Sequence, residues 1–325
     1  MDAARIGIVG AGLSGLACAG VLAGAGAGVT IFERARGAGG RMSTRRTPHG
    51  PFDHGAQYFT AREPAFREAV LGWREAGVIA PWEGRIERVG EGEGPEASPG
   101  ERFVGVPGMS ALLRHLASGL TVRFETTIAA IERGPEGLWL RGGDGVAHGP
   151  FDRAVVAVPG PQAVPLLQAS PAIAGRVATA RLAPCWTLLA EFPSRLDTPL
   201  DGVFFVGADV VWAARDSSKP GRPAGERWIV HGHWGWSAEH EDDAPAAVGE
   251  ALLRAFFGAL KLAPSAPTFL ATHLWRHALP VAPLEVDHVY DPAVGLGACG
   301  DWCGCPRVEG AWLSGVALGR RMLAG

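Results

Sequence analysis

Cysteine is scarce in this sequence, and its charged residues are not gathered in one region. Five cysteines in 325 residues do not make the disulfide framework of a small secreted protein, so we expect a reducing compartment. Cys299, Cys303 and Cys305 cluster, but their spacing lacks the second C-x2-C or the H-x3-H of a structural zinc site, and no metal is predicted. The net charge of −3 includes no basic block, which argues against nucleic acid as a partner.

The start of the chain has no charged residue between Arg5 and Glu33. A stretch of this length would pass a simple hydropathy test for a membrane helix. Three glycines interrupt it, however, and its first apolar block, residues 6–9, has the length of a strand. The start also lacks a charged region followed by an A-x-A cleavage site. We therefore expect a cytoplasmic protein without a membrane segment.

The order of predicted elements indicates two domains, as the length does. A β-α-β pattern opens the chain at residues 5–33, and a strand and a helix close it at residues 294–323. After Pro159 strands dominate, with one amphipathic helix at residues 245–260, and a polar loop at residues 90–101 is expected to be exposed and mobile. We predict an α/β fold in which both chain ends build a Rossmann-like domain and a sheet-rich α+β domain is inserted. The predicted division gives residues 1–76, 103–158 and 270–325 to the first domain and residues 77–102 and 159–269 to the second.

The strongest motif is Gly10-Ala11-Gly12-Leu13-Ser14-Gly15, a G-x-G-x-x-G pattern between a predicted strand and a predicted helix. The first glycine permits a tight turn, the second lets the backbone approach a pyrophosphate, and the third allows close packing of helix on strand. The helix N-terminus adds free N–H groups and a positive dipole end. Glu33 ends the next predicted strand, where a carboxylate can accept hydrogen bonds from ribose hydroxyls. The sequence therefore predicts a dinucleotide site that includes Gly10, Ala11, Gly12, Ser14, Gly15 and Glu33.

A second match to the same pattern, at residues 295–300, is a useful control. Asp301, Gly304 and Pro306 follow it, and Pro306 would break a helix at this place. We interpret this match as a strand and a turn. One nucleotide-binding unit is thus predicted, which argues against a separate nicotinamide reductase domain.

The segment that follows the second strand indicates which nucleotide binds. Residues 33–42, ERARGAGGRM, resemble the second fingerprint of the flavin-containing amine oxidases and glutathione-reductase-like flavoproteins, where paired glycines approach the flavin's phosphates and an arginine adds charge. Residues 53–59, 155–159 and 299–301 are similar to further segments of that superfamily. The resemblance implies an FAD-binding domain with non-covalent FAD and an inserted substrate domain. It adds these residues to the cofactor site: Arg34, Gly40, Arg41, Met42, Gly55, Ala56, Gln57, Tyr58, Ile128, Asp301 and Leu313.

Within that superfamily the chain resembles the renalase-like branch over nearly its whole length. Residues 55–60, 212–222 and 275–278 carry this resemblance, and Asp216 departs from it because Asn is expected there. The resemblance implies oxidation of 2- and 6-dihydro-NAD(P). A hydride would pass to the flavin, and dioxygen would reoxidise the flavin to give hydrogen peroxide. The implied partners are therefore a dihydronicotinamide dinucleotide and dioxygen.

Five residues are candidates for shaping the substrate pocket: Gln57, His231, Trp275, Arg276 and His277. Arg276 could meet a substrate phosphate or lower the pKa of the reduced flavin, and an interdomain salt bridge explains it equally well. His231 could contact substrate, although a strand histidine that is satisfied by backbone, or one that is solvated, is the more common case.

Two other functions stay open. Relatives that oxidise amines tend to use a lysine-held water and an aromatic cage, but this chain has only two lysines, Lys219 and Lys261, and two tyrosines. Lys219 lies in a Ser/Pro/Gly loop, where we expect a phosphate contact or a solvated tip. A non-catalytic nucleotide-binding regulator is the alternative of another class. The segments that resemble a flavoprotein argue against it.

Overall fold

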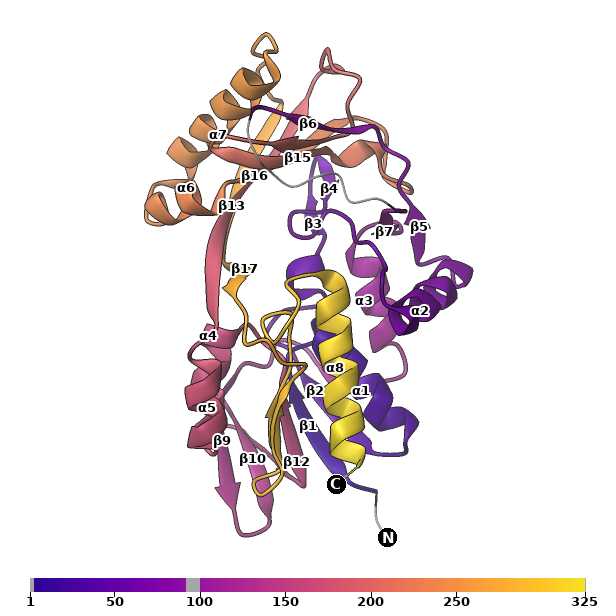
Figure 1. Ribbon diagram of the computed structural model, residues 1–325, viewed down its shortest axis with the longest axis vertical. Coiled ribbons are helices and arrows are strands. Elements are labelled where there is room, and N and C mark those ends of the chain that lie inside the picture. Colours follow the sequence, from indigo (N-terminus) through magenta and orange to yellow (C-terminus); the bar gives the residue numbers. More distant parts are fainter. Residues whose placement is uncertain (1–2, 92–99, 325) are drawn as a thin grey trace.

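A six-stranded sheet at one end of the molecule joins early and late parts of the chain. The structure, a computed structural model, describes residues 3–91 and 100–324, so residues 92–99 of the predicted polar loop lie outside the described residues. The strands are β1 (Arg5–Val9), β2 (Gly28–Phe32), β8 (Thr121–Arg123), β12 (Arg153–Val156), β18 (Val289–Asp291) and β19 (Leu296–Ala298). They run in the order β18-β19-β12-β1-β2-β8, with every pair parallel except the one at the β18 edge (Figure 1). This order confirms a Rossmann-like domain that both chain ends build.

The first sheet is buried, as its sequence requires. In β1 the side chains of Ile6, Ile8 and Val9 are all buried, which is typical of a parallel strand that is covered on both faces. Helices α1 (Leu13–Gly24) and α8 (Val308–Leu323) pack against each other beside the sheet. An antiparallel sheet of three strands, β9 (Ile128–Gly134), β10 (Gly137–Gly142) and β11 (Ala147–Phe151), adjoins β1.

A second six-stranded sheet forms the other end of the molecule. Its strands are β6 (Ile86–Val89), β13 (Arg181–Phe192), β14 (Gly202–Phe205), β15 (Val210–Arg215), β16 (Glu226–Gly232) and β17 (Phe269–Ala282), in the order β17-β13-β16-β15-β14-β6. Helices α6 (Trp234–Glu239) and α7 (Pro245–Leu260) cover one face (Figure 1). Along β13, Trp186, Leu188 and Ala190 point into the core beneath these helices, and Thr187 and Leu189 point the other way. We call this other face the inner face.

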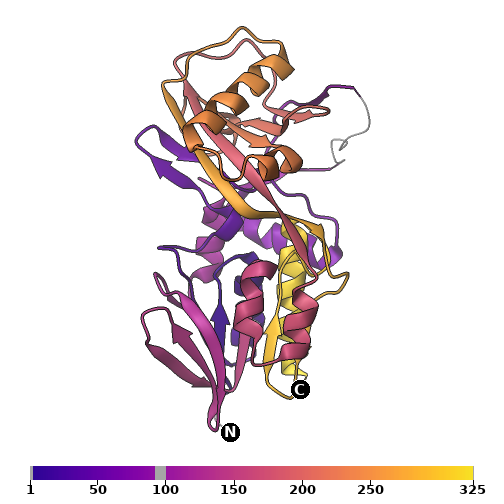
Figure 2. The ribbon, with the colours of Figure 1, turned by 90° about the vertical axis from the view of Figure 1, so that its left-hand side faces the viewer.

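Shorter elements lie between the two large sheets. Figure 2 shows the long strands β13 and β17 running from the second sheet towards the first domain. The ribbon of β3 and β4 lies against the inner face, where Phe52 packs on Leu189 and Ile229. The bounds of these elements are η1 (Gly40–Met42), β3 (Arg45–Thr47), β4 (Gly50–Phe52), α2 (Pro64–Glu75), β5 (Ile79–Pro81), β7 (Phe103–Gly105), α3 (Ser110–Ala117), α4 (Gly160–Ala163), η2 (Val164–Leu167), α5 (Pro171–Val177) and η3 (Asp216–Ser218).

Two segments lie elsewhere than the predicted domain division suggests. Helices α4 and α5 share a hydrophobic core with β9 and β12, although the sequence assigns residues 159–180 to the inserted domain. Strand β17 belongs to the second sheet along its length, although residues 270–325 are assigned to the first domain. The division itself stays a prediction. Among the described residues, no helix combines the length and the hydropathy needed to cross a bilayer.

Candidate functional site

The turn between β1 and α1 has the geometry that the glycine motif predicts. Gly10 adopts φ +105°, a conformation that side chains strongly disfavour. A Cβ on Gly15 would clash with the carbonyl oxygen of Gly10, so this glycine allows the helix to start close to the strand. A Cβ on Gly12 would meet no heavy atom of the described residues within 4 Å. Open space therefore lies against the backbone where a pyrophosphate is expected, and the residues present fit such a group.

Glu33 lies beside this turn and is fixed by backbone groups. Its two carboxylate oxygens accept hydrogen bonds from the N–H groups of Ala11 and Ala35, each at 2.8 Å, and the residue is 9% exposed. Each oxygen has a further lone pair that can accept from a ribose hydroxyl. Arg34, the next residue, is exposed.

Glu33→Ala is expected to weaken FAD binding by about 1–3 kcal/mol, because a charged acceptor is lost. The affinity is measured by titrating FAD into apoprotein and following flavin fluorescence. Glu33→Gln, which keeps an oxygen acceptor without the charge, should lose less. An unchanged FAD affinity in the alanine variant would show that no ribose hydroxyl meets this carboxylate.

The predicted second fingerprint packs onto the glycine turn. The N–H of Gly39 donates to the carbonyl of Ala11 at 3.2 Å. The side chain of Arg41 donates to both carboxylate oxygens of Asp301, at 2.6 and 2.9 Å, and also to the carbonyl of Ala278. Two residues predicted to bind the cofactor are thus joined to each other, and the guanidinium is engaged by a carboxylate rather than left free for a phosphate.

Three other predicted cofactor residues contribute apolar surface nearby. Ile128 and Met42 are buried in the cores on the two sides of the turn, and Leu313 is half-buried in the first part of α8. Ser14 is buried at the start of α1.

The segment from Asp53 to Tyr58 lies between the glycine turn and the second sheet. The N–H of Ala56 donates to the carbonyl of Arg41 at 2.8 Å, and a Cβ on Gly55 would clash with that same carbonyl. The amide nitrogen of Gln57 donates to the carbonyls of Asp53 and Gly55. The segment is therefore held close to the nucleotide loop by its own backbone.

A buried cluster of charges holds the other side of this segment. Lys219 is 2% exposed and donates to Asp216 at 2.7 Å and to the amide oxygen of Gln57 at 2.9 Å. Arg222 pairs with Asp53, which also accepts from the N–H of Met109. The prediction of a solvated tip or phosphate contact for Lys219 is wrong, because the loop folds inward onto two carboxylates.

Burial and ion pairing act in opposite directions on the two carboxyl groups of this cluster. Burial raises the pKa of Asp53, but Lys219 and Arg222, together with hydrogen bonds from Thr44 and Met109, outweigh it and hold the pKa below its usual value. Burial raises the pKa of Asp216, and the charge of Asp53 adds to this effect. Asp216 also marks the one stated departure from the renalase-like pattern. Asp53, Asp216 and Arg222 are not among the site residues predicted from the sequence. The one signal for them in the sequence is that Lys219 stands between Asp216 and Arg222 in a single short loop.

The inner face of the second sheet presents aromatic rings to the segment at Asp53–Tyr58. The indole nitrogen of Trp275 donates to the carbonyl of His54 at 2.9 Å, and the His54 ring lies 4.9 Å from both Trp275 and His273, between centroids. Tyr58 lies 5.5 Å from Trp212 in the same way. These rings form a wall beside the segment that is expected to pass the flavin ring.

The structure brings together three of the five predicted pocket residues. Gln57 belongs to the segment Asp53–Tyr58 and is bonded to Lys219. His231 and Trp275 both contact the backbone of His54 in the same segment. Arg276 points away, with its side chain 59% exposed and paired to Glu241 at 2.6 Å. Arg276 therefore forms a salt bridge, as the alternative interpretation predicts. The bridge is not between domains, because Arg276 and Glu241 both belong to the second-sheet region. His277 is half-buried further along β17.

The histidines of the site are kept uncharged. Burial, with His273 and Arg45 adding to it, lowers the pKa of His54 to about 3. Burial, with the Lys219 ammonium adding to it, lowers the pKa of His231 to about 4. At neutral pH these rings carry no charge, and each offers one donor and one acceptor nitrogen.

The free energy of unfolding is expected to fall as the pH is lowered from about 6.5 towards 4. In this range His54 takes up a proton in the unfolded chain, with a pKa near 6.5, but not in the folded protein. One proton of difference corresponds to about 1.4 kcal/mol per pH unit. Urea unfolding of wild type and His54→Asn at several pH values measures the two slopes. The same slope in both proteins would contradict the assignment of a neutral, buried His54.

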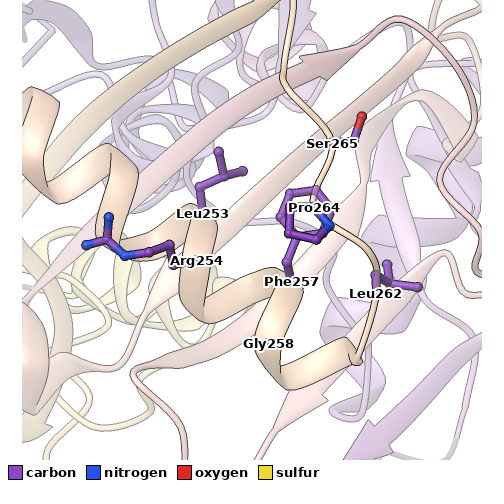
Figure 3. Close-up of a pocket in the computed structure, with 7 residues that line it drawn as sticks. All are labelled: Leu253, Arg254, Phe257, Gly258, Leu262, Pro264 and Ser265. Carbon is purple, nitrogen blue, oxygen red and sulfur yellow. The ribbon is translucent and has the colours of Figure 1, made fainter.

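A surface hollow lies away from this site. Figure 3 shows it between the end of α7 and the loop after it, lined by Leu253, Arg254, Phe257, Gly258, Leu262, Pro264 and Ser265. Its walls are mainly apolar, and α7 covers the opposite face of the second sheet from Thr187. It offers no cluster of groups suited to catalysis.

Solved structures with similar folds include several oxidases. A candidate protoporphyrinogen oxidase from Exiguobacterium sp. 255-15 aligns over 100% of both chains with TM-score 0.77 and 13% identity. Cyclohexylamine oxidase from Brevibacterium oxydans IH-35A aligns over 99% of each chain with TM-score 0.76 and 15% identity. A putrescine oxidase with redesigned cofactor binding aligns over 99% of this chain and 100% of its own with TM-score 0.71 and 13% identity. At such low identities the likeness establishes the fold alone.

Two family models match the sequence. Residues 8–70 match a model described as an NAD(P)-binding Rossmann-like domain, which contains the glycine turn and Glu33. Residues 89–323, well over half of the chain, match the model described as flavin containing amine oxidoreductase. With the fold and the glycine cradle in agreement, the chain belongs to the flavin-containing amine oxidoreductase family.

Proposed function

We propose that the protein is an FAD-dependent oxidase of aberrant dihydronicotinamides. It would take a hydride from 2- or 6-dihydro-NAD(P), give NAD(P)+ and, with dioxygen, produce hydrogen peroxide. The observation that supports this most is the character of the wall beside Asp53–Tyr58. It consists of aromatic rings and neutral histidines, with the buried cation Lys219 behind them. Such a wall suits the face of a flat, uncharged ring.

Little is asked of the side chains in this reaction. When bound, the flavin accepts the hydride and returns the electrons to dioxygen. The glycine turn and Glu33 would hold the nucleotide part of non-covalent FAD, and the backbone at Gly55 would lie along its ring. Trp275 and His54 would orient the substrate ring face to face with the cofactor, which is a positioning effect rather than acid–base catalysis.

Anaerobic mixing of the purified holoenzyme with substrate tests the proposal. We expect 2- or 6-dihydro-NAD(P) to bleach the flavin absorbance and admission of air to restore it with formation of hydrogen peroxide. Bleaching by common amines and none by the dihydronicotinamide isomers would overturn the proposal. Precipitation with acid should release free FAD, since the cofactor is proposed to be non-covalent.

Amine oxidation is the second candidate, and two observations favour it. Lys219 lies buried on the amide of Gln57, beside the segment that is expected to pass the flavin, and two of the similar structures are oxidases of amines by name. The second feature of amine oxidases, an aromatic cage that includes tyrosines, has fewer candidate residues in this chain. Tyr58 lies at the site, but Tyr290 belongs to β18 in the first sheet.

A nucleotide-binding regulator without catalysis is the alternative of another class. It predicts a colourless protein that gains no flavin absorbance when FAD is added. The dihydronicotinamide oxidase predicts a yellow protein with the spectrum of oxidised flavin.

A further inference from the structure

Four side chains lie next to one another across the inner face of the second sheet. Trp212 on β15 is paired with His231 on β16, and His231 is paired with Thr187 on β13. Thr187 is in turn paired with His273 on β17. Directly paired residues of antiparallel strands project to the same face, about 5 Å apart. We call these four residues the polar row.

Three members of the polar row have a polar atom without a partner. The indole nitrogen of Trp212, the Nε2 atom of His231 and the hydroxyl of Thr187 are buried and have no hydrogen-bond partner among residues 3–91 and 100–324. Trp212 is 6% exposed and Thr187 is 0% exposed. The neighbour of the Thr187 hydroxyl is the thiol of Cys185, which is a weak hydrogen-bonding group. Buried polar atoms are almost always hydrogen-bonded, so these three point to a ligand that completes the site.

The next rows on the same face, towards Phe52, are apolar and then charged. One step away the side chains are apolar and pack beneath Phe52, and a further step away an arginine pairs with a glutamate at 3.4 Å. These residues are Ile229, Leu189 and Ala271 in the apolar row, and Arg227 and Glu191 in the charged row. In the charged row the Nε of Arg227 is also unpartnered among the described residues, but the other nitrogens of the same guanidinium are bonded to the carbonyls of Pro223 and Ala224. The polar row is where unpartnered groups of three neighbouring strands lie side by side.

The chemistry of the polar row defines the ligand. Trp212 can only donate a hydrogen bond, and the hydroxyl of Thr187 can donate or accept. The ring of His231 lies against the backbone of His54, and this contact acts to raise its pKa, as a ring N–H that faces a carbonyl does. Since Nε2 is the unpartnered nitrogen, we take Nδ1 as that donor and Nε2 as an acceptor. An ammonium group could not accept from Trp212 and would lie near the Lys219 cation. A carboxylate could not donate to His231. A primary carboxamide does both and is uncharged.

We propose that the polar row binds the carboxamide group of the dihydronicotinamide substrate, with Trp212, His231 and Thr187 as substrate-positioning residues. This inference rests on the proposed function and assigns the subsite that would hold the reacting ring in register with the flavin. The carboxamide oxygen accepts from Trp212 or Thr187, and its NH2 group donates to His231.

Two dinucleotides that differ only in this group test the assignment on the holoenzyme. Calorimetric titration compares NAD+, which carries a carboxamide, with nicotinic acid adenine dinucleotide, which carries a carboxylate. We expect wild type to prefer NAD+ by about tenfold or more, since one to two hydrogen bonds distinguish the two ligands. Thr187→Val and Trp212→Phe should each lower the affinity for NAD+ by about three- to tenfold and reduce the preference.

Thr272→Val is the matched control. Thr272 lies on β17 next to His273, and its hydroxyl is bonded to the carbonyl of Pro245 on the helix-covered side, so the preference should stay as in wild type. The ratio of flavin to protein absorbance reports whether each variant is folded and holds its cofactor. If Trp212→Phe does not fold, Thr187→Val still tests the inference, because valine has the same shape as threonine.

Two results would overturn the inference in different ways. If dihydronicotinamides bleach the flavin but the variants keep the preference of wild type, or wild type shows none, the subsite is wrong and the proposed function stands. If neither dinucleotide binds and dihydronicotinamides leave the flavin oxidised, the proposed function fails and the subsite fails with it.

Discussion

A Gly12→Val variant is expected to purify as a folded protein without flavin. The backbone at Gly12 is extended, with φ −79° and ψ 177°, and a β-branched residue adopts this conformation without strain. A Cβ there meets no heavy atom within 4 Å among the described residues, so the protein itself has room for the new side chain. The valine would instead occupy the path by which the pyrophosphate reaches the backbone. The ratio of flavin to protein absorbance measures the loss, and circular dichroism measures the fold.

Two other glycines of the same region make this result interpretable. Gly20→Val, on the exposed side of α1 and also without a heavy atom within 4 Å of its Cβ among the described residues, should retain flavin. Gly15→Val should disturb the fold, because its Cβ would clash with the carbonyl of Gly10. If Gly12→Val retains FAD as wild type does, the pyrophosphate does not lie at this turn.

The second large effect concerns the buried ammonium of Lys219. Lys219→Met is expected to lower the free energy of unfolding by about 3–5 kcal/mol, the cost of removing one partner from a buried ion pair. Asp216 would lose the charge that faces it at 2.7 Å, and the amide of Gln57 would lose its donor. Urea unfolding of the two proteins at neutral pH measures the difference.

The chain offers a matched control and a rescue for this prediction. Lys261→Met removes an exposed lysine at the end of α7 and should change stability by less than about 0.5 kcal/mol. Adding Asp216→Asn to Lys219→Met removes the uncompensated carboxylate and should recover part of the loss. Equal stability of Lys219→Met and wild type would mean that the ion pair contributes nothing to the fold.

The parts of the site that are local in sequence could be predicted from it. The glycine turn, Glu33 and the loop up to Met42 lie within forty residues, and each role follows from backbone geometry that the motif itself requires. The interpretation of the second glycine match, at residues 295–300, as a strand and a turn is also confirmed. Strand β19 ends at Ala298, and α8 begins only at Val308. A proline at position 306 is incompatible with a helix that starts directly after the glycines.

The half of the site that the second sheet and the Lys219 loop form depends on contacts between segments far apart in the sequence. Lys219 is buried because its loop meets Asp53 and Gln57, which lie more than 150 residues earlier. The polar row exists because β15, β16, β13 and β17 pair in one register, and a slip of one residue would turn every member to the other face. Neither fact can be read from composition or from spacing.

Strand geometry alone separates two of the predicted pocket residues on β17. Trp275 and Arg276 are consecutive residues of one strand, so their side chains must point to opposite faces. Only one of them can face the segment Asp53–Tyr58, and the structure shows that Trp275 does, while Arg276 pairs with Glu241 on the other side. The alternation of a strand over residues 275–277 thus places Trp275 and His277 on one face and Arg276 on the other.

A crystal structure of the protein grown with FAD tests the central claim most directly. Our account predicts the diphosphate against residues 10–15, nearest to the α-carbon of Gly12, with a ribose on Glu33 and the flavin ring between Gly55 and the polar row. Clear density for the diphosphate at any other part of the chain, or an empty glycine turn in crystals saturated with FAD, would contradict it.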